Sequence, residues 1–353
     1  MRLSPTLVYS VEAAFLGPAP LLFDFTRLFM IAGPRRASLS VALVALVAGL
    51  VAAGCGSSAP ADGSTASNAS ATAGTAIVAV GAENEYANVI SQIGGRYVRA
   101  SAIMSDPNTD PHTFEASPSV AQTVSQAKLV VQNGVGYDDF MSKIESASPS
   151  SSRKVIDVQT LLGLPDSTPN PHLWYDPRTM PAVAKALASD LSALAPAHAA
   201  YFQANERRLD RSLQPWLTQL KEFNTKYPDT AVATTEPVAD YMLQAAKIQN
   251  LTPFSMQADI MNGTDPAPQA VTQQNAVLSG HRVTVFVYNQ QVTDTVTQNF
   301  LKAAHSAGIP VVGVYETMPA PGYDYQSWMM AEVKALEKAV TSKVSTEKLT
   351  SVS

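Results

Sequence analysis

Short apolar runs alternate with amphipathic segments along most of the chain. In the first half the strand-like runs are 76–80, 98–103 and 129–132, and the segments with helical spacing are 86–93, 119–126 and 138–144. Such runs, bounded by turn residues, predict strands, and apolar positions three and four residues apart predict helices. A strand–helix–strand rhythm predicts a mostly parallel sheet with helices on its faces.

The same rhythm returns in the last third of the chain. Strand-like runs are 231–235, 283–287 and 311–315, and helical segments are 237–246, 269–278, 292–307 and 325–340. The continuous apolar runs here predict strands that are buried on both faces.

The segment between these regions, 177–223, has no strand signal, and its apolar residues recur at helical spacing. It predicts one long helix, with Pro196 and Pro215 as kink points. The fold class is therefore α/β, with two lobes that each contain a mostly parallel sheet. We expect an N-terminal lobe at 75–176, a linking helix at 177–224, a C-terminal lobe at 225–343 and a tail at 344–353. A chain of 353 residues is long enough for two such domains.

The first part of the chain has the order of an export signal. Arg35 and Arg36 precede an apolar run at 39–51, which ends in small residues before Cys55. The run is shorter than the roughly 20 apolar residues of a membrane-spanning helix. We therefore expect 1–54 to be an export segment.

Cys55 is the only cysteine, which excludes an internal disulfide and a zinc site with several thiolates. Its position after small residues resembles the lipobox of bacterial lipoproteins, in which this thiol is acylated; a buried structural cysteine is the alternative. The Ser-, Ala- and Thr-rich segment 55–74 predicts a flexible tether. Residues 1–29 do not fit a signal peptide, and our hypothesis is that translation begins at Met30.

The net charge of -5 and the pI near 5.6 provide no basic surface for a phosphate backbone. We therefore expect no nucleic-acid partner. A cation is easier for such a chain to accommodate.

Two histidines stand in stiff loops after strand-like runs. His112 lies in Asp-Pro-His-Thr-Phe-Glu at 110–115, and His172 lies in Asn-Pro-His-Leu-Trp at 170–174. The preceding proline fixes φ, so each imidazole is presented from a restricted backbone, as a preorganised metal ligand requires.

Two carboxylates end strand-like runs of the second lobe. Glu236 follows 231–235 and Glu316 follows 311–315. Ligands of open α/β sheets collect at the carboxyl ends of strands. Two neutral imidazoles and two carboxylates would compensate a +2 ion and complete a four-residue coordination set.

Simpler readings exist for these residues. Either histidine could bond only to backbone, Glu236 could stabilise a helix N-terminus, and Glu316 could be a solvated loop acid. Groups that could orient the imidazoles, or form only loop hydrogen bonds, are Glu115, Asp176 and Asn289. Aromatic residues expected to pack the cleft walls are Phe114, Trp174, Tyr315 and Trp328. The remaining histidines, expected at the surface, are His198, His281 and His305.

Taken together, these motifs resemble the zinc and manganese solute-binding lipoproteins of bacterial metal ABC transporters, the TroA-like family. The resemblance covers about 77–340. It is carried by the two histidine motifs, by Thr-Glu-Pro-Val-Ala-Asp-Tyr at 235–241, and by Tyr-Glu-Thr-Met-Pro at 315–319 with Tyr-Gln-Ser-Trp-Met at 325–329.

The resemblance implies two α/β lobes joined by one long backbone helix, with Zn²⁺ or Mn²⁺ bound in the cleft between them. It assigns His112 and His172 to the first two ligands and Glu236 to a third that varies between histidine and glutamate. Glu316 falls where most members have aspartate. The His-rich loop of many zinc-specific members is missing from 146–168, and the choice between the two metals stays open.

The family also implies a monomeric receptor on the outer face of the cytoplasmic membrane, held there by the lipid on Cys55. Its partners would be the permease and ATPase of a metal importer. A secreted metal-dependent hydrolase is the enzyme alternative, but four protein ligands leave no position for a catalytic water, and no His-Glu-x-x-His motif is present. A surface adhesin is the third alternative.

Overall fold

The structure is a computed structural model that describes residues 76–108, 111–319 and 321–351. The predicted export segment 1–54, Cys55 with its predicted acylation, and the whole of the predicted tether 55–74 lie outside the described residues. Among the described residues, no helix combines the length and apolar character that crossing a membrane would need.

The first lobe contains a four-stranded parallel sheet. Its strands are β1 (Ile77–Glu83), β2 (Val98–Met104), β3 (Leu129–Gln132) and β4 (Lys154–Asp157), in the order β2-β1-β3-β4. Its helices are α1 (Asn84–Gly94), α2 (Pro118–Gln126), α3 (Asp139–Ala147) and α4 (Val158–Leu161), and its 3-10 turns are η1 (Gly95–Tyr97), η2 (Pro111–Thr113) and η3 (Leu173–Tyr175). The parallel pairing confirms the strand–helix rhythm predicted from the sequence.

Helix α1 shows how the sequence builds this lobe. Tyr86, Val89, Ile90 and Ile93 form one fully buried face at helical spacing. The helix stops at Gly95, whose φ is +49°, a conformation that favours glycine.

The second lobe repeats the arrangement. Its strands are β5 (Ala231–Thr234), β6 (Gln249–Asn250), β7 (Val285–Asn289) and β8 (Val311–Val314), all parallel in the order β6-β5-β7-β8. Its helices are α7 (Asp240–Ala245), α8 (Phe254–Met261), α9 (Pro268–Ser279), α10 (Thr295–Ser306) and α11 (Tyr325–Ser342). Every residue of β7 and β8 is buried, as their continuous apolar runs predict.

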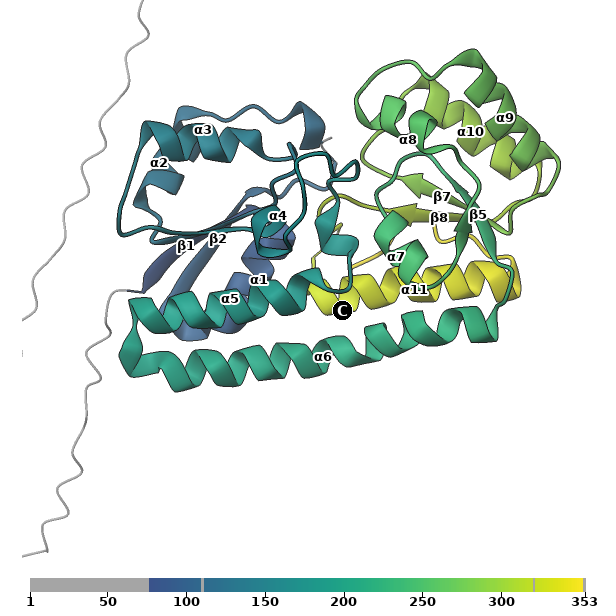
Figure 1. Cartoon of the computed structure of the whole chain (residues 1–353). Helices are drawn as coiled ribbons and strands as arrows, with labels where there is room; N and C mark the ends of the chain where they lie inside the picture. The colour runs from purple at the N-terminus through teal and green to yellow at the C-terminus, as the bar shows by residue number, and fades with distance from the viewer. Residues whose placement is uncertain (1–75, 109–110, 320, 352–353) are drawn as a thin grey trace, which may run out of the picture. The chain divides into compact units, whose positions relative to one another are not determined.

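The linking segment contains the long backbone helix, but the helix begins later than expected. The segment forms α5 (Thr179–Leu194), the 3-10 turn η4 (Pro196–His198) and α6 (Ala199–Lys226), and α5 packs along α6 (Figure 1). Pro196 marks a chain reversal rather than a kink, because a proline disfavours helical geometry in the residue before it, and Ala195 has φ −140° and ψ 75°.

Helix α6 is the long helix that was expected to join the two lobes. It is 28 residues long, which corresponds to about 42 Å, and Pro215 lies inside it. It packs against α1 of the first lobe and α11 of the second. The predicted single helix over 177–224 is therefore a helical hairpin whose second member joins the lobes.

The C-terminal segment, expected as a tail, pairs with β8. Thr346 forms a parallel bridge with Val312, and its backbone bonds to Val311 and Gly313. A Cβ at Gly313 would lie 1.9 Å from the carbonyl oxygen of Glu347, so the close approach requires glycine. The segment covers the edge of the sheet, which would otherwise present unpaired backbone groups.

Side-chain amides on α1 join the two lobes directly. Asn84 Oδ1 accepts a bond from the backbone N–H of Met318 at 2.8 Å. Two turns further on, the amides of Gln92 and Gln326 bond to each other, with the Gln326 donor 2.9 Å from its acceptor. One face of α1 thus fixes the start of the segment that leads into α11.

Candidate metal centre

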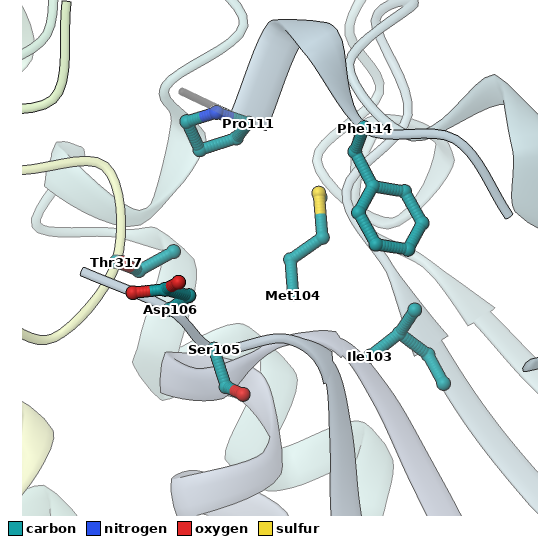
Figure 2. A pocket seen from close by; sticks show the side chains of 7 residues that line it. All are labelled: Ile103, Met104, Ser105, Asp106, Pro111, Phe114 and Thr317. Atoms are coloured by element: carbon teal, nitrogen blue, oxygen red, sulfur yellow. The ribbon is translucent and has the colours of Figure 1, made fainter. Parts of the chain in front are cut away.

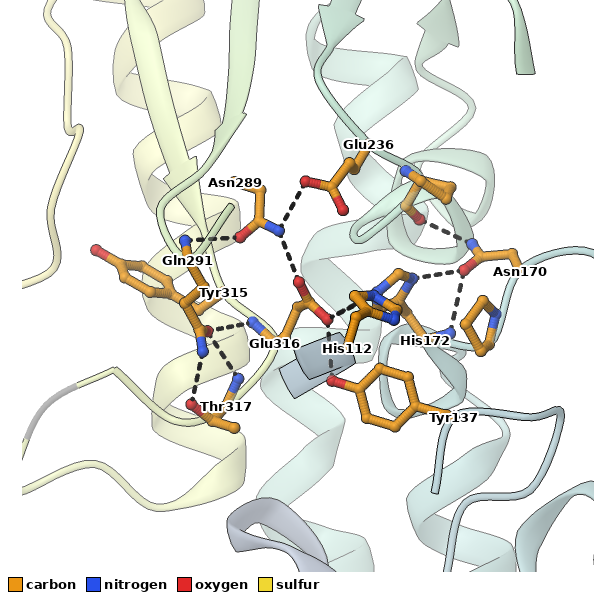
Figure 3. Close-up of polar contacts among 12 residues, drawn as sticks. His112, Tyr137, Asn170, His172, Glu236, Asn289, Gln291, Tyr315, Glu316 and Thr317 are labelled. Atoms are coloured by element: carbon orange, nitrogen blue, oxygen red, sulfur yellow. Dashed lines mark hydrogen bonds and ion pairs between the residues drawn. The ribbon is translucent and has the colours of Figure 1, made fainter. Parts of the chain in front are cut away.

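Polar side chains lie at the carboxyl ends of three adjacent strands, at one edge of the second sheet. Glu236 follows β5, Asn289 is the last residue of β7, and Glu316 follows β8. The carboxyl ends of parallel strands lie at the same edge, so these side chains come together. The first lobe contributes His112 from η2 and His172 from the residue before η3 (Figure 3).

Two imidazoles converge on one carboxylate. Glu316 Oε2 lies 3.2 Å from Nε2 of His112 and 3.3 Å from Nε2 of His172. The ligand atoms of these three residues all lie within 4.8 Å of one another. His172 and Glu316 are fully buried, whereas the His112 side chain is 21% exposed. The structure therefore brings three of the four predicted residues into one cluster.

Glu236 adjoins this cluster through an amide. The Nδ2 atom of Asn289 donates to Glu236 Oε1 at 3.0 Å and to Glu316 Oε1 at 2.7 Å. Glu236 is only 2% exposed. The fourth predicted residue thus lies beside the other three, joined to Glu316 by a shared donor.

The hydrogen bonds of Asn170 define the tautomer of His172. Asn170 Nδ2 donates to the carbonyl oxygen of Pro237 at 2.8 Å, so its Oδ1 is the atom that faces His172. That oxygen lies 2.7 Å from Nδ1 of the imidazole and also accepts from the His172 backbone at 3.1 Å. Nδ1 therefore carries the proton, and in the neutral ring Nε2 presents a lone pair toward Glu316.

The pKa values of His172 and Glu316 are both lowered, which favours the unprotonated form of each group. Burial lowers the pKa of His172 and favours its neutral form, although Glu316 opposes the effect. Burial also opposes ionisation of Glu316, but hydrogen bonds and charge from the two imidazoles outweigh it and hold its pKa well below the usual range. The carboxylate is ionised at neutral pH.

Tyr137 and Trp174 enclose the imidazoles. The Tyr137 hydroxyl donates to Glu316 Oε2 at 2.9 Å, and burial, together with nearby carboxylates, raises the pKa of this phenol well above 10. The ring centroid of Trp174 lies 5.4 Å from that of His172, as expected for an aromatic wall. Tyr137 thus remains a proton donor to the carboxylate.

The three groups that could orient the imidazoles or form only loop hydrogen bonds have the following surroundings. Asp176 pairs with Arg178 at 2.6 Å, and Glu115 is exposed. Asn289 holds the two carboxylates instead. Asn170 is the residue that orients the His172 imidazole, and the sequence analysis did not assign it this role. Its position two residues before His172 in a proline turn is a usable signal.

The other predicted aromatic walls lie further away. Phe114 lines a cavity of about 200 Å³ with Met104 and Pro111, beside the loop that carries His112 (Figure 2). Tyr315 points away from the cluster in Figure 3, and Trp328 is buried in the core.

The remaining histidines lie elsewhere. His281 and His305 are exposed, and His305 lies 3.0 Å from Glu347. The half-buried His198 stacks on Tyr97 with ring centroids 3.7 Å apart. Among the described residues, the cluster of His112, His172 and Glu316 is the single group of three or more metal-binding side chains at ligand spacing.

Known proteins with this sequence pattern are metal-binding proteins by name. A segment of 94 residues is 32% identical to a putative metal-binding protein of Thermotoga maritima, covering 27% of this chain and 33% of that protein. A segment of 134 residues is 26% identical to the zinc-binding protein TroA of Treponema pallidum, covering 35% of this chain and 43% of TroA. The chain thus aligns with less than half the length of these curated relatives.

Solved structures share the fold over their whole length. The crystal structure of ZnuA matches with a TM-score of 0.62 at 20% identity, covering 76% of this chain and all of ZnuA. An Mn-bound S38A mutant of a periplasmic metal-binding protein from Candidatus Liberibacter asiaticus matches with a TM-score of 0.62 at 16% identity, covering 75% of this chain and 99% of that one. Both likenesses confirm the two-lobed α/β fold.

The sequence profile of one family matches residues 80–339, which is most of the chain and nearly all of the folded part. This match confirms the resemblance drawn from the motifs. The chain belongs to the ZnuA family, described as component A, periplasmic, of the zinc-uptake complex.

Proposed function

We propose that this chain is the extracytoplasmic receptor of an ABC-type importer and carries one divalent transition-metal ion, Zn²⁺ or Mn²⁺, between its lobes. The ligands would be His112, His172, Glu236 and Glu316. The proposal depends most on one observation: Nε2 of the buried His172 lies 3.3 Å from Oε2 of the buried Glu316, while Nδ1 of the same ring already contacts Asn170 Oδ1 at 2.7 Å.

Two acceptors at this distance need a proton or a metal ion between them. Nδ1 of His172 carries the single proton of the neutral ring and donates a hydrogen bond to Asn170 Oδ1, so Nε2 has no proton. Without a cation, the contact with Glu316 requires a second proton on a fully buried imidazole, which burial disfavours. A metal ion satisfies both atoms and leaves the tautomer unchanged. The arrangement of these side chains therefore supports a cation site.

The charge and donor types fit a transition metal. Two carboxylates neutralise a +2 ion, and two imidazoles favour zinc and other late transition metals over calcium or magnesium. Zn²⁺ accepts such a tetrahedral N₂O₂ set, and Mn²⁺ accepts carboxylate with imidazole. Because intrinsic affinity for Zn²⁺ exceeds that for Mn²⁺ at most sites, affinity by itself does not identify the transported ion.

The closed, buried site suits carriage rather than catalysis. We infer that the protein binds and releases its ion without turning over a substrate. The export segment at 1–54 and the lipobox-like Cys55 support anchoring at the outer face of the cytoplasmic membrane, from which a monomer would deliver metal to a permease and its ATPase.

The test is stoichiometric metal binding by purified protein with matched histidine variants. The native protein should bind one Zn²⁺ or Mn²⁺ per chain, and His112→Ala with His172→Ala should abolish tight binding. His281→Ala with His305→Ala removes two exposed imidazoles as the control and should bind as the native protein does. Equal binding by both double variants would refute the proposed site, and steady metal-dependent hydrolysis of test substrates would refute the receptor function.

A cellular experiment tests delivery. Deleting the gene should impair growth under zinc or manganese starvation, and addition of the corresponding metal should restore it. Full-length protein with Cys55→Ala should be released from the membrane fraction. Unchanged metal uptake in the deletion strain would contradict the importer function.

A further inference from the structure

Asn289 holds both carboxylates of the site in a defined orientation. Its amide Nδ2 donates to Oε1 of Glu236 and Oε1 of Glu316, and the residue is 1% exposed. Figure 3 shows the amide between the two acids. An amide has two N–H donors, so a single side chain serves both carboxylates.

The orientation of this amide is determined by its neighbours. Asn289 Oδ1 accepts a bond from the backbone N–H of Gln291 at 3.0 Å, so Nδ2 must face the acids. Gln291 in turn accepts bonds from the backbone N–H groups of Glu316 at 2.7 Å and Thr317 at 3.0 Å. The two amides thus fix the Glu316 side chain and its backbone together.

This arrangement limits how many oxygens an ion can take. Glu316 Oε2 faces the imidazoles, while Oε1 is engaged by Asn289. An ion that took both oxygens of either carboxylate would compete with the amide donor for Oε1. Displacement would leave a buried N–H without a partner, which is costly in a low-dielectric interior. The amide therefore favours coordination of the ion by one oxygen of each carboxylate.

We propose that Asn289 is a specificity-determining residue, which restricts both carboxylates to one oxygen each and so favours a four-coordinate ion, Zn²⁺, over an ion that prefers more ligands, Mn²⁺. This inference rests on the proposed metal site and deepens it. One oxygen from each acid and one nitrogen from each imidazole give the four-coordinate N₂O₂ set typical of zinc. Mn²⁺ prefers octahedral, oxygen-rich coordination, which needs additional carboxylate oxygens or water.

The test uses Co²⁺ as a spectroscopic substitute for the native ion. Four-coordinate Co²⁺ absorbs visible light much more strongly than six-coordinate Co²⁺, so the spectrum reports coordination number. The native protein should give the strong four-coordinate spectrum. Asn289→Leu, which keeps similar volume without donors, should give a weaker, higher-coordination spectrum and lower the preference for Zn²⁺ over Mn²⁺ by about 10-fold.

Asn250→Leu is the matched control. Asn250 also bridges two side chains of the second lobe, with Nδ2 donating to Thr234 at 3.1 Å and to Asp240 at 2.9 Å, but no described bond joins it to Glu236 or Glu316. It should keep the native spectrum and metal preference. Asn289→Ala serves as a second variant if the leucine does not fold.

The outcomes separate the two proposals. A native protein that binds no metal stoichiometrically refutes the receptor function itself. Stoichiometric binding with a six-coordinate native spectrum overturns the role of Asn289, whatever the variants do. An unchanged spectrum and an unchanged Zn²⁺-to-Mn²⁺ preference in folded Asn289 variants also overturn it.

Discussion

Replacing Glu332 by Gln should stabilise the protein at alkaline pH and have little effect near pH 4.5. Glu332 lies in α11 and is fully buried. Burial raises the pKa of its carboxyl from 4.5 to about 8, despite hydrogen bonds from Tyr175 and Trp328 that act in the opposite direction. The folded protein therefore keeps this acid neutral at pH 7, whereas the unfolded chain ionises it.

The hydrogen-bond geometry around Glu332 is compatible with the neutral acid. The Tyr175 oxygen lies 2.9 Å from the carbonyl oxygen of Tyr315 and 2.9 Å from Oε1 of Glu332. A phenol has one proton, so it can donate to only one of these acceptors. A neutral Glu332 could supply the proton of the second contact whenever the phenol donates to Tyr315.

The sign and size follow from linkage. The stability that the neutral acid contributes is fully present below pH 4.5 and is lost as pH rises through about 8. Each tenfold change in acidity corresponds to about 1.4 kcal/mol, so the full span is on the order of 5 kcal/mol. Gln keeps an acceptor for Trp328 and does not ionise, which removes this loss.

The assay is denaturant unfolding of native protein and Glu332→Gln between pH 4.5 and 8.5. The free-energy difference between the two proteins should grow with pH in favour of Gln and reach a few kcal/mol at the alkaline end. Comparing the two proteins at each pH removes the contribution of other titrating groups that they share. A difference that stays constant across this range would refute the assignment of a neutral, buried Glu332.

Three further predictions concern the metal centre and the contact between the lobes. Asn170→Ala removes the acceptor that fixes the His172 tautomer and should weaken metal binding about 10- to 100-fold, measured by competition with a chelator; unchanged affinity would contradict that role. Acidification through about pH 6 should release the ion, because protons compete for the imidazole nitrogens, and affinity that is flat from about pH 7 to 5 would contradict histidine ligation. Asn84→Ala should lower the free energy of unfolding by about 1–2 kcal/mol and speed hydrogen exchange at the backbone amide of Met318. An exchange rate at this amide equal to that of the unmutated protein would show that the contact is not maintained in solution.

Much of the fold follows from periodicity. The predicted strand at 129–132 coincides with β3, and the predicted helix at 325–340 differs from α11 by two residues. Strand β4 at 154–157 was missed because it is a short edge strand that begins with an exposed lysine, so it lacks a continuous apolar run. Strand β6 has two residues, too few for any periodic signal.

The helical hairpin shows what local pattern cannot determine. Apolar spacing is the same whether the chain continues past Pro196 or reverses there, and the reversal is decided by packing of α5 on α6 and α1. Pro215, by contrast, stays inside its helix. Two prolines with similar local sequence signals therefore have different outcomes because their tertiary contacts differ.

The site was predictable as far as its charged residues and their strands. His112, His172 and Glu316 cluster because loops after strands of both lobes meet at the carboxyl edges of the sheets. Asn289 was a candidate from the sequence and Asn170 has a positional signal in its proline turn, but the sequence did not give the contacts of either amide. Neighbours that are distant in the sequence determine whether the amide oxygen or the amide nitrogen of each asparagine faces the site.

The most direct test of the central claim is a crystal structure of the metal-loaded protein with anomalous diffraction at the absorption edge of the bound ion. Our account predicts one anomalous peak within about 2.0–2.2 Å of a nitrogen of His112, a nitrogen of His172 and one oxygen each of Glu236 and Glu316. A peak away from these side chains, or an ion that Glu236 or either histidine does not reach, would contradict it.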